Sequence, residues 1–170
     1  MQRIAVVGAP GSGKSTLARR LGAMLSVPVY HLDRLFWNPG WVQTPRAEFA
    51  ARQADLVGRD RWIMDGNYAS TMELRLQAAD TIIFLDFPRW LCIQRVLRRA
   101  LFERNRPDMP EGCLERFDWE FIQFLYYIWT FPKQRRKHIE HRLRELSPEQ
   151  TVIRLGSPDQ VTSFLSQLTA

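Results

Sequence analysis

The chain has 170 residues, of which 45% are hydrophobic and 25% are charged. These fractions are close to the averages of globular proteins, so they exclude a disordered or fibrous chain, and the length suits one domain with its own core. The net charge of +6 is concentrated, because residues 89–144 contain 13 Lys or Arg against 7 Asp or Glu, and the remainder contains 11 of each. Such a basic segment attracts the phosphates of nucleotides or nucleic acid, and solvated helix faces are the alternative interpretation.

No segment predicts export or membrane insertion. The start MQRIAVVGAP lacks a signal-peptide pattern. The apolar stretch 121–131 is shorter than the roughly 20 residues that span a bilayer, and it predicts a buried helix instead. Cys92 and Cys113 have neither metal-ligand spacing nor a CxxC pair. We therefore expect a cytoplasmic protein, monomeric or homodimeric, in which both cysteines are incidental.

Strands and helices alternate along the chain. Short apolar, β-branched runs predict strands at 2–7, 27–32, 61–65, 80–87 and 151–155. Amphipathic spacing predicts helices at 15–25, 45–60, 71–78, 88–104, 118–146 and 158–168, with an interruption of the fifth near Pro132. Residues 105–117 contain two prolines and a glycine, so a lid-like segment is expected at about 103–118. The alternation predicts an α/β domain whose parallel sheet binds ligands at the carboxyl ends of its strands.

The stretch GAPGSGKST matches the phosphate-binding motif G-x-x-x-x-G-K-[ST] between a predicted strand and a predicted helix. Glycines let successive backbone N–H groups face an anion, and the start of the helix adds its positive dipole. Lys14 is expected to bridge the β- and γ-phosphates of ATP, and the Ser15 hydroxyl to bind Mg²⁺. The predicted nucleotide-binding residues are Gly8, Ala9, Pro10, Gly11, Ser12, Gly13, Lys14, Ser15 and Thr16.

Two carboxylates compete for the second protein contact to Mg²⁺. Asp65 ends a predicted strand beside the phosphate-binding motif, where the magnesium shell needs an acceptor. Asp86 ends the next predicted strand, but the helix that follows makes it a candidate helix cap. We favour Asp65. The guanine motif N-K-x-D of GTPases is absent, and the D-x-x-G match at 55–58 lies within a predicted helix.

Asp33 follows the second predicted strand, across the expected crevice from the phosphate-binding motif. A carboxylate at this position can accept a hydroxyl proton, although it can also simply cap a short helix. His31 and Arg34 are expected to orient Asp33 or to meet an anionic substrate, and His31 alternates with Asp33 along an extended segment. Arg95 and Arg99 are four residues apart and therefore share a helix face. They could contact the transferring phosphate, and exposed arginines that form salt bridges are the alternative interpretation.

Several motifs together resemble the bacterial DNA topology modulation protein family, which is similar to adenylate kinases and other small-molecule P-loop kinases. They are GAPGSGKST, YHLDRLFWNPGW, DGNY, TIIFLDFPRWLCIQRVLRR, RPDMPEGC and FPKQRR, and the resemblance covers nearly the whole chain. It implies a three-layer P-loop fold with helices on both faces of a five-stranded parallel sheet in the order 2-3-1-4-5. It also implies an acceptor region after the second strand and an arginine-bearing lid.

The resemblance implies further site residues. Arg95 and Arg99 match arginines that adenylate-kinase-like proteins place on the transferring phosphate, and shikimate and gluconate kinases have an aspartate in the region of Asp33. Asn67 and Tyr68 resemble a substrate-facing turn. Arg106, Arg135 and Arg136 are further candidates for phosphate contacts, or they form exposed salt bridges. Seven aromatic residues are expected to be core or to line a pocket: Trp37, Trp41, Tyr68, Trp119, Tyr126, Tyr127 and Trp129.

The functional hypothesis is therefore an ATP- and Mg²⁺-dependent phosphotransferase acting on a small molecule, with nucleotides and nucleosides among the candidate acceptors. An ATP-switched, nucleic-acid-associated regulator of DNA topology is one alternative, and an ATPase without an acceptor is another. The sequence has no helix-turn-helix, zinc or OB-fold signature, so direct binding to nucleic acid is not expected, though it stays an alternative.

Overall fold

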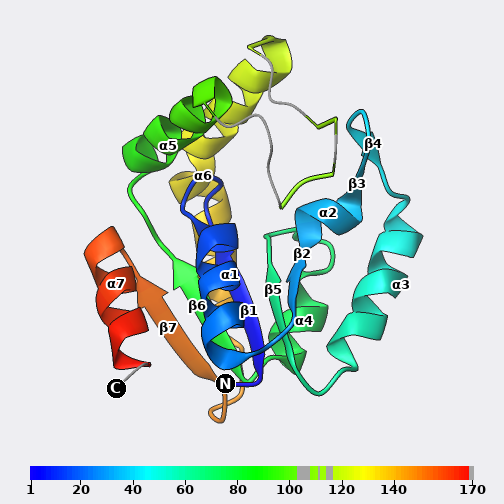
Figure 1. The fold of residues 1–170 in the computed structure, drawn as a ribbon, viewed down its shortest axis with the longest axis vertical. Coiled ribbons are helices and arrows are strands. Elements are labelled where there is room, and N and C mark those ends of the chain that lie inside the picture. The colour runs from blue at the N-terminus through cyan, green and yellow to red at the C-terminus, as the bar shows by residue number, and fades with distance from the viewer. Residues whose placement is uncertain (103–107, 111, 114–116, 169–170) are drawn as a thin grey trace.

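A parallel five-stranded sheet forms the centre of the computed structural model, which describes residues 1–102, 108–110, 112–113 and 117–168. The strands lie in the order β2-β5-β1-β6-β7, which is 2-3-1-4-5 when these five are counted along the chain (Figure 1). Their bounds are β1 (Arg3–Gly8), β2 (Val29–His31), β5 (Trp62–Asp65), β6 (Thr81–Leu85) and β7 (Thr151–Leu155). The predicted fold class and strand order are confirmed.

The central strands are apolar on both faces because helices cover both sides of the sheet. Residues 4–7 of β1 have no exposed surface, and all five residues of β6 are buried. Such near-continuous apolar runs are typical of strands in the middle of a parallel sheet. β7 lies at the edge and is largely exposed, so its sequence is more mixed.

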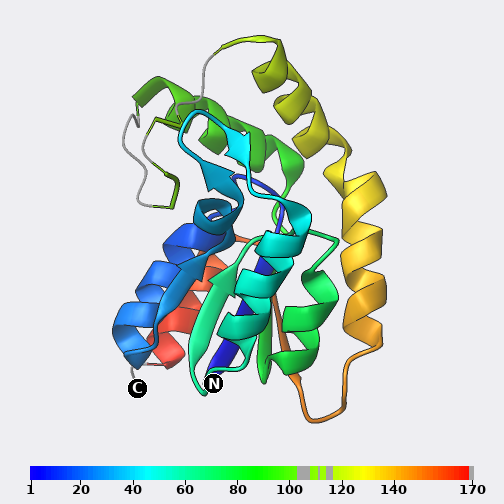
Figure 2. The same ribbon diagram turned by 90° about the vertical axis from the view of Figure 1, so that its right-hand side faces the viewer.

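The helices form the two outer layers. Figure 2 shows α1 (Lys14–Leu25) and α7 (Pro158–Gln167) on one side of the sheet, with α4 (Met72–Ala78) and α6 (Trp119–Arg144) on the other. α3 (Arg46–Val57) packs beside α4, and α5 (Arg89–Phe102) packs against α6. Within the described residues, no helix combines the length and the apolar character that crossing a bilayer requires.

The predicted interruption of the helix near Pro132 is wrong. α6 continues through Pro132 for 26 residues and changes direction visibly along its length (Figure 2). Proline removes one backbone N–H and clashes with the preceding turn, which bends a helix when packing holds both halves in place. Ile128 and Phe131 before the proline and Ile139 after it are buried, so both halves are held by the core.

Residues 32–43 contain α2 (Leu32–Phe36), which is the short helix of the alternative interpretation of Asp33, although His31 and not Asp33 is its N-cap residue. They also contain the antiparallel hairpin β3 (Trp37–Asn38) and β4 (Val42–Gln43), which was not predicted. The expected lid-like segment 103–118 lies partly outside the described residues, as does Arg106. Its described residue Cys113 is buried and donates a weak hydrogen bond from Sγ to the Asn38 carbonyl at 3.5 Å. This part of the segment therefore contacts the hairpin.

Candidate functional site

The loop between β1 and α1 carries the predicted phosphate-binding motif, residues 8–16, and we call it the phosphate loop. At two positions its backbone conformation fits only glycine. Gly8 and Gly11 have φ angles of 147° and 79°. A Cβ atom on Gly8 would lie 2.4 Å from the Leu85 carbonyl oxygen, and one on Gly11 would lie 2.4 Å from the Cys92 carbonyl oxygen. The loop is thus pressed against the end of β6 and the first turns of α5.

Two polar groups of this loop fit an anionic ligand. The first is the Ser12 hydroxyl, which is buried and has no hydrogen-bond partner among the described residues. It lies just before the start of α1, where the N-cap residue is Gly13 and no described side chain accepts from the first N–H groups. The second is the Lys14 ammonium. Lys14 donates from Nζ to the Ala9 carbonyl at 3.0 Å. Burial lowers the pKa of Lys14, and the carboxylates of Asp33 and Asp65 partly oppose that shift. A phosphate in the loop would satisfy the Ser12 hydroxyl and the Lys14 ammonium together.

Asp65 connects the phosphate loop to the second strand. Its Oδ2 accepts a 2.6 Å hydrogen bond from the Ser15 hydroxyl, and its Oδ1 lies 2.5 Å from His31 Nδ1. His31 and Asp65 are register partners at the ends of β2 and β5, so the sheet itself places them side by side. In the described part of the chain, no three His, Cys, Asp or Glu residues form a metal cage. Mg²⁺ in nucleotide sites commonly takes one or two protein ligands, completed by phosphates and water.

Asp33 lies in the first turn of α2 and accepts a hydrogen bond of 2.6 Å from the Tyr68 hydroxyl. The Tyr68 ring packs with Phe36 and Phe49 in a cluster of three rings, at centroid distances of 4.8 and 4.9 Å from the two phenylalanines. Burial and the charge of Asp33 raise the pKa of Tyr68, so the phenol keeps its proton and remains a donor. Asp33 also lies within electrostatic range of Lys14. The predicted acceptor carboxylate and the phosphate loop therefore border the same site.

The two arginines of α5 approach the phosphate loop. Arg95 donates from Nη1 to the Ser12 carbonyl at 3.2 Å, and its guanidinium lies over the Phe87 ring. Arg99 is close enough to Lys14 to help lower the pKa of that amine. Three cations thus converge where a nucleotide would present its terminal phosphates. Arg135 is placed differently, since its guanidinium lies 5.5 Å from the ring centre of Tyr127 on α6.

No protein-family model matches this sequence, and no curated protein matches it. Among solved structures, it is similar to shikimate kinase from Acinetobacter baumannii in complex with shikimate, with a TM-score of 0.58 and 15% identity, covering 99% of this chain and 91% of the other. It is also similar to shikimate kinase from Bacteroides thetaiotaomicron, with a TM-score of 0.56 and 16% identity, covering 99% and 96%. The chain has the shikimate-kinase fold. At this identity the likeness concerns the fold alone.

Within this shikimate-kinase fold, one interpretation of the predicted acceptor region after β2 needs correction. His31 and Asp33 do not alternate along one strand, because β2 ends at His31 and Asp33 belongs to α2. His31 bonds to Asp65, and Asp33 accepts a hydrogen bond from Tyr68. Arg34 is exposed on α2. A substrate contact for Arg34 or His31 stays a prediction.

Two further candidates have structural partners. The Asn67 side chain accepts from the Gly8 N–H at 3.1 Å and donates to the Gly8 carbonyl at 2.8 Å, so it anchors the phosphate loop. Asp86 forms ion pairs with Arg136 and Arg154 at the ends of β6 and β7. Asp65, which contacts Ser15, is therefore better placed than Asp86 to serve a metal.

Arg75 was missed by the sequence analysis. It has no exposed surface, and it donates from Nη2 to the carbonyls of Gly66 and Asn67 and from Nη1 to Gln53. These bonds hold the turn after β5, which carries Tyr68. Burial lowers the pKa of Arg75. The spacing of Arg75 with the apolar Met72 and Leu76 on α4 was the available signal, since the three share one helix face.

Replacing Gly11 by Ala is predicted to distort the phosphate loop. Gly40 is a matched control, because its φ is 78° against 79° for Gly11 but a Cβ there would meet nothing within 4 Å. Gly40→Ala should lower the free energy of unfolding by about 1–2 kcal/mol through backbone strain. Gly11→Ala should lose roughly 1–3 kcal/mol more and weaken ATP binding. Urea unfolding and ATP titration check this, and equal losses at both sites would contradict it.

Proposed function

We propose that this chain transfers the γ-phosphoryl group of ATP to a hydroxyl group of a small molecule, with Mg²⁺ as the metal cofactor. The observation that carries the proposal is the pairing of two features around Lys14. The phosphate loop lies on one side, and Asp33, fixed by Tyr68, lies within electrostatic range on the other. The shikimate-kinase fold supports this proposal, because small-molecule kinases share that architecture.

The nucleotide-binding residues would be 8–16, with Lys14 on the β- and γ-phosphates. Ser15 and Asp65 would hold Mg²⁺, which neutralises phosphate charge when bound. Asp65 is suited to that role because it is buried at the end of β5 and already contacts the Ser15 hydroxyl. His31 fixes the other oxygen of Asp65 and thereby orients the carboxylate.

Asp33 would act as the general base. As the acceptor oxygen forms its bond to the γ-phosphorus, the hydroxyl proton passes to the Asp33 carboxylate, and the bond between phosphorus and the β,γ-bridging oxygen breaks to release ADP. Lys14, Arg95 and Arg99 would offset the negative charge that spreads over the transferring group. Phosphoryl transfer needs alignment and charge neutralisation more than covalent help from the protein.

The carboxylate of Asp33 favours a hydroxyl over a phosphate as the accepting group. A carboxylate repels an anionic acceptor at close range, whereas it attracts the proton of an alcohol. Nucleosides and sugar-like alcohols are therefore better candidates than nucleotides. We also propose, on the motifs quoted above, that the chain belongs to the DNA topology modulation protein family.

A screen of nucleosides, nucleotides, sugars and sugar acids tests the proposed activity. ADP release is measured in ATP and Mg²⁺, and thermal shift identifies the ligands that bind. The expected result is an alcohol that accelerates ADP release and appears as a phosphorylated product in mass spectrometry. ATP hydrolysis that no compound accelerates would contradict the proposal and favour an ATPase without an acceptor.

A further inference from the structure

The first half of α6 presents a row of large apolar side chains to solvent. Trp119, Ile122, Tyr126 and Trp129 are 66, 55, 67 and 49% exposed. The separations of three, four and three residues place them on one face of the helix. The prediction that aromatic residues are core residues is therefore wrong for Trp119, Tyr126 and Trp129, which are all exposed. We call Trp119, Ile122, Tyr126 and Trp129 the α6 stripe.

The area of the α6 stripe is that of an interface core. A buried aromatic side chain removes about 150–250 Å² from solvent, so the four side chains present on the order of 400 Å² of apolar surface. Patches of this size on soluble proteins are frequently interaction sites. A standard interface covers about 800 Å² on each partner, of which a little over half is apolar. The α6 stripe matches that apolar share.

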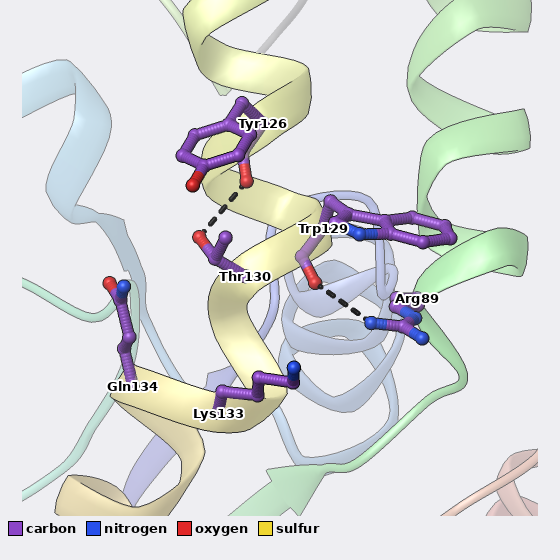
Figure 3. Close-up of a pocket in the computed structure, with 6 residues that line it drawn as sticks. All are labelled: Arg89, Tyr126, Trp129, Thr130, Lys133 and Gln134. Carbon is purple, nitrogen blue, oxygen red and sulfur yellow. Dashed lines mark hydrogen bonds between the residues drawn. The ribbon is translucent and has the colours of Figure 1, made fainter.

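A hollow of about 290 Å³ adjoins one end of the α6 stripe (Figure 3). Tyr126, Trp129 and Lys133 of α6 line it together with Arg89 of α5. The Arg89 guanidinium lies 3.9 Å from the ring centre of Trp129 and donates to the Trp129 carbonyl at 3.4 Å. An aromatic wall with two cations suits an incoming aromatic ring, which gains both apolar contact and cation–π attraction.

Trp119, at the other end of the α6 stripe, has an aromatic ring that could enter this hollow. If two copies of α6 run antiparallel about a point between residues 125 and 126, Ile122 faces Trp129 of the second copy. Trp119 then faces residue 132 of the second copy, beside the hollow. A two-fold axis repeats each contact. The Trp119 ring of each copy therefore meets the hollow of the other copy, and the dimer has two such contacts. We propose that the α6 stripe binds the α6 stripe of a second copy of this chain in antiparallel orientation.

The charges of α6 favour this orientation. Residues 121–139 contain no Asp or Glu, whereas Asp118 lies just before the α6 stripe and Lys133 just after it. In the antiparallel pair, Asp118 of one copy faces Lys133 of the other at both ends. A parallel pair would place Lys133 against Lys133. Single-stranded nucleic acid also suits aromatic and basic side chains, but the helix-packing spacing and the acidic start of the stripe favour a second copy.

Sedimentation equilibrium over a hundredfold range of protein concentration tests the proposal. The expected mass rises with concentration to twice the 20.0 kDa of one chain. Tyr126→Glu and Trp119→Ala should each raise the dimer dissociation constant at least about tenfold. Val152→Glu, a change at an exposed apolar side chain on β7, is the matched control and should leave the dimer intact. Circular dichroism reports whether each variant is folded.

Exchange of the two end charges tests the orientation. Lys133→Asp should weaken the dimer, and adding Asp118→Lys should restore it, because each new pair again has opposite signs. Loss of the Asp118 cap on α6 affects the stability of each chain, which thermal melts measure separately. A chain that stays monomeric throughout, a folded Tyr126→Glu variant that dimerises normally, or monomers that bind an oligothymidylate through Trp129 would overturn the proposal.

Discussion

Asp33→Asn should lower kcat/KM for the acceptor by about 10²–10⁴-fold, the usual contribution of a positioned general base. Asn keeps the shape of the side chain and can still accept the Tyr68 hydrogen bond that holds Asp33 at 2.6 Å. It cannot take up the hydroxyl proton at neutral pH. The measurement is steady-state ADP release with the acceptor identified by screening, and KM for ATP should stay close to the value of the unchanged chain.

Tyr68→Phe is the companion variant, because it retains the carboxylate and removes only its hydrogen-bond donor. The ring can still pack against Phe36 and Phe49. A hydrogen bond to a charged group contributes about 1.5 kcal/mol or more, so the loss should be roughly tenfold or somewhat larger. If Asp33→Asn leaves turnover of a verified acceptor unchanged, Asp33 is not the base. A Tyr68→Phe loss as large as that of Asp33→Asn would point to Tyr68 as a direct participant.

Lys14→Met should lower the rate of phosphoryl transfer by about 10²–10³-fold, the effect of removing one preorganised donor from a transferring group. The same variant should be more stable than the unchanged chain without nucleotide. Burial lowers the pKa of Lys14, which means that folding at neutral pH carries the cost of a desolvated ammonium. Methionine has a similar length and no charge, so it removes that cost. Thermal melts with and without ATP and Mg²⁺ separate the two effects.

The stability difference should depend on pH in a defined direction. Between the lowered pKa of Lys14 in the folded chain and its ordinary value near 10.5, the unfolded chain binds a proton that the folded chain has released. Stability of the unchanged chain therefore gains a contribution as pH rises through this window, and Lys14→Met has no such contribution. The excess Tm of the variant should shrink from pH 7 toward pH 10. An excess that grows with pH would contradict this account.

The sheet could be predicted from the sequence because its determinants are local. Each strand is a short apolar run followed by a helix, and β6 carries the continuous apolar pattern of a strand covered on both faces. The hairpin β3–β4 could not be found in this way, because each strand has only two residues and no periodic pattern. Pro132 misled for a different reason. Proline usually ends a helix, but the residues on both sides of Pro132 are buried, so packing stabilises the continuous helix.

The sequence could indicate single residues of the candidate site but not the contacts between them. Glycine and lysine spacing located the phosphate loop, and the ends of strands located Asp65 and Asp33. The hydrogen bond between Tyr68 and Asp33 joins residues 35 positions apart, and Asn67 joins Gly8 across 59 positions. Such pairs arise only when the sheet brings the ends of β1, β2 and β5 together. Single-sequence patterns carry no information about them.

The bond pair between Asn67 and Gly8 has a mechanical consequence. β1 and β5 are paired through Val6 and Asp65, and the Gly66 N–H donates to the Val6 carbonyl. Beyond this pair, the side-chain amide of Asn67 takes the place of a neighbouring strand, because it bonds to both the N–H and the carbonyl of Gly8. The hydrogen bonding of the sheet therefore continues as far as Gly8, at the start of the phosphate loop. We therefore expect the side chains on helices, such as those of Asp33 and Arg99, to move more readily than the backbone of Gly8.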